Sequence, residues 1–183
     1  FKPLVDELHL DLQIRWNDAT HKVAIFVSKE DHCLHDLLLL QRDGALHCSI
    51  SLVISNHSDV HTVAERFGVP FHHIPVDEST DAEEQQHALL KEHAIDLIVL
   101  ARYMRILSPA FIECYEEKII NIHHSFLPAF AGGRPYHQAH EKGVKLIGAT
   151  AHYATAELDE GPIIEQGVIR VSHKDSVADM MHK

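Results

Sequence analysis

Along most of the chain, short apolar runs alternate with segments in which apolar residues recur at helical spacing. Runs rich in valine, isoleucine and leucine predict strands at residues 22–28, 48–55, 71–74, 95–100, 118–123, 146–153 and 162–171. The amphipathic segments predict helices at residues 31–42, 59–67, 80–93, 108–115 and 137–142. Residues 175–183 form a helix-like stretch at the end of the chain. Proline and glycine predict a loop at 126–135, and Asp159-Glu160-Gly161 predicts a tight turn.

Local signals add detail to three of these elements. Thr80 or Asp81 is the expected N-cap of the helix at 80–93. Ser108-Pro109 supplies an N-cap and a first helical residue for the next helix. Residues 95–100 are nearly all apolar, which is typical of a strand covered on both faces.

The repeated alternation of strands and helices predicts the fold class. It indicates one α/β domain with a mostly parallel central sheet flanked by helices. Ligands of such sheets bind beyond the carboxyl ends of the strands. Functional residues are therefore expected just after Val27, Leu100 and Ile122.

Composition narrows the class of protein. The 183 residues suit one domain, and 45% hydrophobic with 23% charged residues is ordinary for a globular protein. No apolar run approaches the roughly 20 residues that span a bilayer, so no membrane partner is expected. Acidic residues outnumber basic ones by 27 to 16, giving a net charge of −11, which argues against nucleic acid as a partner.

Cysteine and histidine give no metal signature. The three cysteines have no paired spacing and predict reduced thiols in a cytoplasmic protein. Histidine is abundant, with 18 residues, and the pairs His57/His61 and His137/His140 have spacings that a metal tolerates. Because no recognised zinc motif surrounds them, we interpret them as surface residues and predict neither a metal nor a cofactor.

Three short segments contain groups suited to acyl chemistry. Asn121 and His123 lie two apart on a strand, so their side chains leave the same face, where an amide can hold an oxyanion and an imidazole can move a proton. Asp159, in the acidic turn, can favour a charged imidazole or orient a water. The segment 103–108 places apolar groups beside Arg105, as in a slot for a flat heterocycle. Each segment alone is more often ordinary structure.

Together and in this order the segments resemble the folate-dependent formyltransferase family. The resemblance rests on Asn-Ile-His-His-Ser-Phe-Leu-Pro at 121–128, Leu-Asp-Glu-Gly-Pro-Ile-Ile at 158–164 and Met-Arg-Ile-Leu at 104–107, and it runs from about residue 22 to the end. Motifs at 27–34, 123–130, 134–139 and 148–153 are most similar to members that transfer the formyl group to water. The resemblance implies a Rossmann-like domain and 10-formyltetrahydrofolate as substrate.

The resemblance also implies roles for individual residues. Asn121 corresponds to the oxyanion-binding asparagine, and His123 and Asp159 correspond to the catalytic histidine and aspartate. The implied substrate-binding residues, which include walls of a pterin pocket, are Met104, Arg105, Ile106, Leu107, His152, Ala154, Thr155 and Glu157.

The resemblance bears on domain organisation as well, because members of this enzyme group usually carry an N-terminal regulatory domain. We therefore expect residues 1–21 to be the linker remnant of such a domain and residues 22–183 to be a catalytic domain truncated at its C-terminus. An incomplete domain with an exposed edge also makes a homo-oligomer an expected state.

The acceptor of the formyl group decides the reaction. In glycinamide ribonucleotide formyltransferases a glycine-rich loop after the first strand cradles the acceptor's phosphate through backbone N–H groups. Here that loop reads Ser28-Lys29-Glu30-Asp31-His32-Cys33, with two acids and no glycine, although Lys29 argues the other way. We therefore expect hydrolysis to formate and tetrahydrofolate, which would supply formate and balance one-carbon pools for purine biosynthesis.

Four alternative functions compete with this expectation. Formyl transfer to glycinamide ribonucleotide, or to a charged tRNA or a sugar amine, needs the same catalytic trio. A folate-binding sensor would not need Asn121, His123 and Asp159 together. A dinucleotide-dependent oxidoreductase would carry Gly-x-Gly-x-x-Gly after the first strand, which is absent here.

Overall fold

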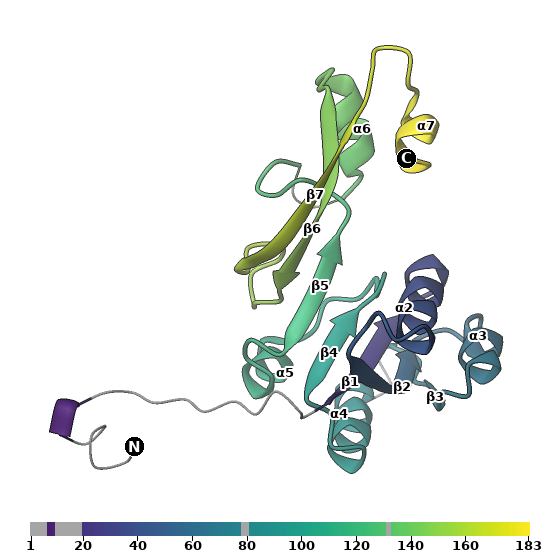
Figure 1. The fold of residues 1–183 in the computed structure, drawn as a ribbon, viewed down its shortest axis with the longest axis vertical. Coiled ribbons are helices and arrows are strands. Elements are labelled where there is room, and N and C mark those ends of the chain that lie inside the picture. The colour runs from purple at the N-terminus through teal and green to yellow at the C-terminus, as the bar shows by residue number, and fades with distance from the viewer. Residues whose placement is uncertain (1–6, 10–19, 78–80, 131–132) are drawn as a thin grey trace.

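The computed structural model describes residues 7–9, 20–77, 81–130 and 133–183. Its centre is a seven-stranded sheet with the order β3-β2-β1-β4-β5-β6-β7 (Figure 1). The strands are β1 (His21–Val27), β2 (Cys48–Ser55), β3 (Phe71–His73), β4 (Leu97–Leu100), β5 (Ile119–His123), β6 (Leu146–Tyr153) and β7 (Ile163–Arg170). The first five run parallel, and β6 and β7 are added antiparallel at one edge. The predicted α/β fold with a mostly parallel sheet is confirmed.

Helices cover both faces of the parallel part of the sheet. They are α2 (His32–Arg42), α3 (His61–Arg66), α4 (Ala82–Glu92) and α5 (Pro109–Cys114). Two more helices, α6 (Pro135–Glu141) and α7 (Val177–Met181), follow later in the chain. Alternate residues of β1 divide the core: Ala24 and Phe26 pack with α4 and α5, whereas Ile25 and Val27 pack with α2 and α3. Each face of β1 thus has its own buried cluster.

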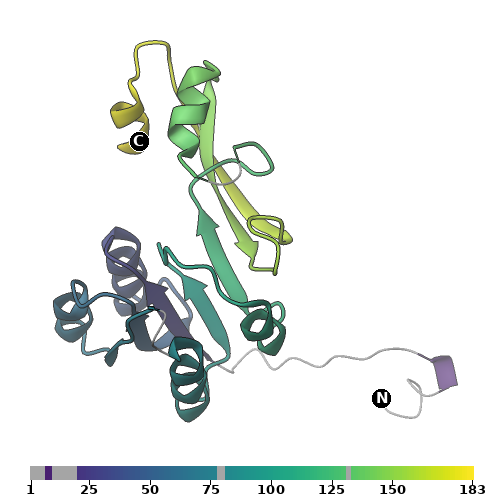
Figure 2. The same cartoon turned by 180° about the vertical axis from the view of Figure 1, so that it is seen from behind.

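The last two helices belong to a separate, smaller core. Ala139 of α6 and Met180 of α7 pack with Ile147 and Val171, at the end of the sheet that β6 and β7 extend (Figure 2). A capping box between Ser176 and Asp179 starts α7. Within the described residues, no helix has both the length and the apolar character that crossing a membrane requires.

Several predicted boundaries need correction. The helix expected at 59–67 spans only His61–Arg66, because a turn with a His61 N–H to Ser58 hydrogen bond precedes it. The helix expected at 137–142 begins two residues earlier, at Pro135, which follows Arg134 in a left-handed conformation (φ 58°). The strand expected at 95–100 begins at Leu97, because the N–H of Ile95 still closes the end of α4 through Leu90.

Further expectations concern the burial of β4 and the N-caps of α4 and α5. The apolar sequence of β4 predicted a strand covered on both faces. This prediction is wrong for one face, because Leu97 and Val99 are only half-buried. Ser108 caps α5 as predicted, accepting from the N–H of Phe111. Asp81 occupies the N-cap of α4 without a capping hydrogen bond. Thr80 and most of the predicted linker at 1–21 lie outside the described residues.

Candidate active site

The three predicted catalytic side chains converge at the junction of β5 and β6. Asn121 and His123 lie on β5, and the antiparallel pairing sets Asn121 opposite His152 of β6. The Nδ1 of His123 lies 3.3 Å from Oδ1 of Asp159, in the loop that follows β6. The side chains of His123 and Asp159 are only 8% and 5% exposed, so their contact is shielded from water. The structure therefore places Asn121, His123 and Asp159 together.

The backbone of the loop after β6 brings Asp159 into the site. Asp159 has φ 60°, in the left-handed region that aspartate tolerates better than most residues. Two residues later, Gly161 packs so closely on the carbonyl of Tyr153 that an added Cβ would lie 1.6 Å from that oxygen. The N–H of Tyr153 donates to the carbonyl of Pro162 at 2.9 Å. These contacts fasten the turn to β6 and fix the direction of the Asp159 carboxylate.

The contact between His123 and Asp159 indicates which ring nitrogen of His123 carries the hydrogen. A carboxylate can only accept, so with Asp159 ionised the hydrogen of a neutral His123 lies on Nδ1. The buried Nε2 atom then carries a lone pair, and it has no hydrogen-bond partner among the described residues. His123 can therefore take a proton at Nε2 while Asp159 stabilises the resulting imidazolium.

His152 holds Asn121. The carbonyl of Tyr153 lies 3.0 Å from Nδ1 of His152 and can only accept, so that nitrogen carries the hydrogen. Nε2 of His152 then accepts from the Asn121 amide nitrogen at 3.2 Å. His152 is fully buried and also lies 3.8 Å from the Asp159 carboxylate. This hydrogen bond orients the Asn121 amide, and an amide N–H in this place can donate to a developing oxyanion.

Two pockets meet at Asn121 and Asp159. The inner pocket, of about 90 Å³, is bounded by the segment after β4 and the loop after β6, and it contains Arg105, Ile106, Leu107, His152, Ala154, Thr155 and Glu157. The outer pocket, of about 300 Å³, is lined by Arg102, Met104, His123, His124 and Arg134 together with residues shared with the inner one. The predicted substrate-binding residues thus gather around the trio, with Met104 in the outer pocket only.

The sequence interpretation missed Arg102, His124 and Arg134. Nη1 of Arg102 lies 3.0 Å from Nδ1 of His124, whose ring is next to that of His123, the predicted catalytic histidine. Burial lowers the pKa of His124 to about 4, aided by the positive charge of Arg102 and by His123, while Asp159 opposes the shift. The one signal in the sequence was the doubled histidine at 123–124, of which only the first was assigned a role.

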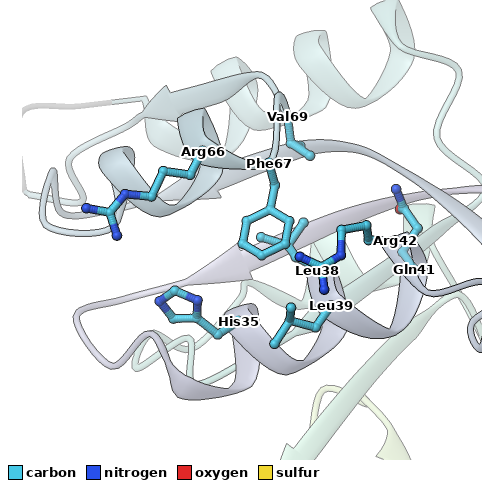
Figure 3. A pocket seen from close by; sticks show the side chains of 8 residues that line it. All are labelled: His35, Leu38, Leu39, Gln41, Arg42, Arg66, Phe67 and Val69. Carbon is cyan, nitrogen blue, oxygen red and sulfur yellow. The ribbon is translucent and has the colours of Figure 1, made fainter.

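A larger cavity, of about 530 Å³, lies away from these residues, between α2 and α3 (Figure 3). Phe67 extends into the space between the two helices, with His35 and Arg42 on the opposite side. The residues that line this cavity include none of the predicted catalytic residues. Among the described residues, no group of three or more His, Cys, Asp or Glu side chains is arranged to hold a metal ion.

Comparison with known proteins identifies the family of the chain. Residues 21–183 match the family described as formyl transferase. A Synechocystis relative named formyltetrahydrofolate deformylase is 53% identical over 182 residues, covering 98% of this chain and 64% of the relative. The solved structure of a formyltetrahydrofolate deformylase from Pseudomonas syringae pv. tomato is 47% identical with a TM-score of 0.93, covering 100% of this chain and 62% of that one.

The fold is shared with transferases as well. A phosphoribosylglycinamide formyltransferase structure from Anaplasma phagocytophilum is 34% identical with a TM-score of 0.83, covering 90% of this chain and 79% of that one. The chain spans less than two thirds of the length of both deformylase relatives. The family match covers nearly all of the chain and includes every residue of the site, which confirms the resemblance seen in its motifs. The chain therefore belongs to the formyl transferase family.

Proposed function

We propose that this chain hydrolyses 10-formyltetrahydrofolate to formate and tetrahydrofolate. The observation that carries the proposal is the convergence of Asn121, His123 and Asp159 where the two pockets meet. An amide donor, an imidazole and a buried carboxylate are the groups that attack on a formyl carbon requires. The deformylase relatives at about half identity support the same reaction.

The proposed mechanism begins with the pterin in the inner pocket and the formyl carbon beside Asn121. Nε2 of His123 accepts a proton from a water that Asp159 helps to orient, and the water oxygen bonds to the formyl carbon. The Asn121 N–H stabilises the oxyanion that forms. The carbon–nitrogen bond then breaks, and Nε2 of His123 returns the proton to the departing nitrogen. Formic acid leaves and ionises, and tetrahydrofolate is released.

The loop after β1 supports water as the acceptor. The N–H of Ser28 already donates to the carbonyl of Arg102 at 3.1 Å. Its hydroxyl donates to Asn56 at 2.7 Å and accepts from the N–H of Met104 at 2.9 Å, so Ser28 ties the loop to the segment after β4. Glu30 and Asp31 beyond it are exposed acids that would repel a phosphate.

The alternative function is formyl transfer to an amine such as glycinamide ribonucleotide. The likeness to the Anaplasma phagocytophilum transferase favours it, because the same sheet supports both reactions. The two functions differ in what they need: hydrolysis proceeds without any amine, whereas transfer does not.

A turnover assay separates the two functions. The chain is incubated with 10-formyltetrahydrofolate and no amine, and formate and tetrahydrofolate are measured. We expect equal amounts of both products, and loss of both in Asp159→Asn, because an asparagine disturbs the protonation that His123 needs. Asp36→Asn, the same change at an exposed position of α2, is the matched control and should retain activity. Product release only after addition of an amine would instead support the transferase.

Further predictions accompany this proposal. We propose that the enzyme acts in the cytoplasm, uses no cofactor, associates with copies of itself and serves one-carbon supply for purine biosynthesis. The N-terminal regulatory domain also stays a prediction, based on the resemblance. Gel filtration and light scattering of the chain test the association, with a monomer mass as the contradicting result.

A further inference from the structure

His124 lies in the reaction pocket although strand geometry would send it elsewhere. Successive residues of a strand point to opposite faces, but β5 ends at His123 and the chain bends at His124. The two imidazole rings consequently lie 5.5 Å apart with planes inclined by 36°. Both rings line the outer pocket together with Asn121 and Asp159.

Contacts on two sides fix the His124 ring. The Tyr136 ring of α6 lies 5.7 Å away at an angle of 30°, on a different element from His123. Arg102, held at φ 61° just after β4, directs Nη1 to Nδ1 of His124 at 3.0 Å. A guanidinium can only donate, so Nδ1 is the acceptor and the hydrogen of the neutral ring lies on Nε2. His124 therefore presents a fixed N–H donor.

We propose that His124 is a specificity-determining residue that binds the attacking water through its Nε2–H and disfavours an amine in that position. The inference rests on the proposed hydrolysis. A water oxygen has two lone pairs, so it can accept from His124 with one and attack the formyl carbon with the other. A neutral amine has a single lone pair, and accepting the same hydrogen bond makes that pair unavailable for attack.

The charge of the pocket acts in the same direction. Arg102, Arg105 and Arg134 all line the outer pocket. These three guanidinium groups repel a protonated amine that enters the pocket, whereas they do not repel neutral water. The pairing with Arg102 also opposes protonation of His124 itself, which keeps the ring neutral and its donor pattern constant.

The test is a competition between water and hydroxylamine, a small amine that is largely neutral at pH 7. The chain and its variants are given 10-formyltetrahydrofolate with hydroxylamine, and formate and formylhydroxamate are both quantified. The variants are His124→Leu, which removes the donor, and His124→Gln, which keeps an N–H. His137→Leu, on α6 outside both pockets, is the matched control.

In His124→Leu we expect formate release to fall by roughly tenfold to a hundredfold, the cost of a mispositioned reactant. The KM for the folate should stay within about twofold, and the hydroxamate share of product should rise about tenfold, because only water depends on the donor. His124→Gln should lie between His124→Leu and the wild type, and His137→Leu should match the wild type.

Two results overturn the inference in distinguishable ways. If the wild-type chain releases formate but His124→Leu lowers formate and hydroxamate by the same factor, His124 is structural and the proposed hydrolysis stands. If the wild-type chain releases no formate without an amine, the proposed function itself fails and this inference fails with it.

Discussion

The turn that carries Asp159 can be displaced with one methyl group. In Gly161→Ala the added Cβ would lie 1.6 Å from the carbonyl oxygen of Tyr153 and 2.8 Å from its carbon. To reach even a 3.0 Å contact, the turn must retreat from β6 by about 1.4 Å. Both atoms of the clash belong to backbone, so rotation of a side chain cannot relieve it.

The displacement has consequences for stability and for catalysis. Overpacking against backbone costs roughly 1–3 kcal/mol of the free energy of unfolding. Asp159 lies two residues before Gly161, and its carboxylate contacts His123 at 3.3 Å, so a comparable shift takes the contact beyond hydrogen-bonding range. A misplacement of about 1 Å costs about a hundredfold in rate, and we expect kcat for formate release to fall by that factor.

The assay is steady-state formate release together with urea unfolding. Gly167→Ala is the matched control, because a Cβ added to that glycine of β7 meets no atom within 4 Å. The control should keep wild-type kcat. If Gly161→Ala is folded and turns over within twofold of Gly167→Ala, this turn does not position Asp159.

Three other changes have defined outcomes. Asn121→Ala should lower kcat by roughly 10²–10³ with little change in melting temperature, because one oxyanion donor is lost; near-normal turnover would exclude that role. Phe111→Ala, at a fully buried position between the sheet and α4, should cost about 3–5 kcal/mol in urea unfolding, and a loss under 1 kcal/mol would contradict the described core. His124 has its pKa lowered from 6.5 to about 4 by burial, Arg102 and His123. Between those pH values the unfolded chain binds more protons, so stability falls as pH drops from 6.5 to 4, and His124→Gln should flatten this fall. Because the ring is half-buried, solvent screening reduces the effect to roughly 1–2 kcal/mol, and equal slopes for variant and wild type would contradict it.

The sequence predicted the parts of the fold that depend on local periodicity. Apolar runs located all seven strands, and the two-residue spacing of Asn121 and His123 placed both side chains on one face. Boundaries were less accurate where tertiary contacts decide them. The left-handed Arg134 before Pro135 starts α6 early, and the hydrogen bond from Ile95 to the end of α4 delays β4.

The site was predicted only in part, because its assembly depends on long-range contacts. Nothing in the spacing of Asp159 shows that its turn packs on Tyr153 and directs the carboxylate at His123, so its role came from the family resemblance. The pairing of Arg102 with His124 was missed for a related reason. Strand alternation predicts that the side chains of His123 and His124 point to opposite faces of the sheet. The bend after β5 brings His124 back to the pocket.

The most direct test of the proposed hydrolysis is a reaction in ¹⁸O-labelled water. The chain is given 10-formyltetrahydrofolate without any amine, and the formate is analysed by mass spectrometry. Attack by a water held at His123 and Asp159 predicts formate with one ¹⁸O atom, released in step with tetrahydrofolate and absent with Asp159→Asn. Two results together would contradict hydrolysis and assign the site to formyl transfer. Labelled formate would form only at the uncatalysed rate, and product would appear once an amine is added.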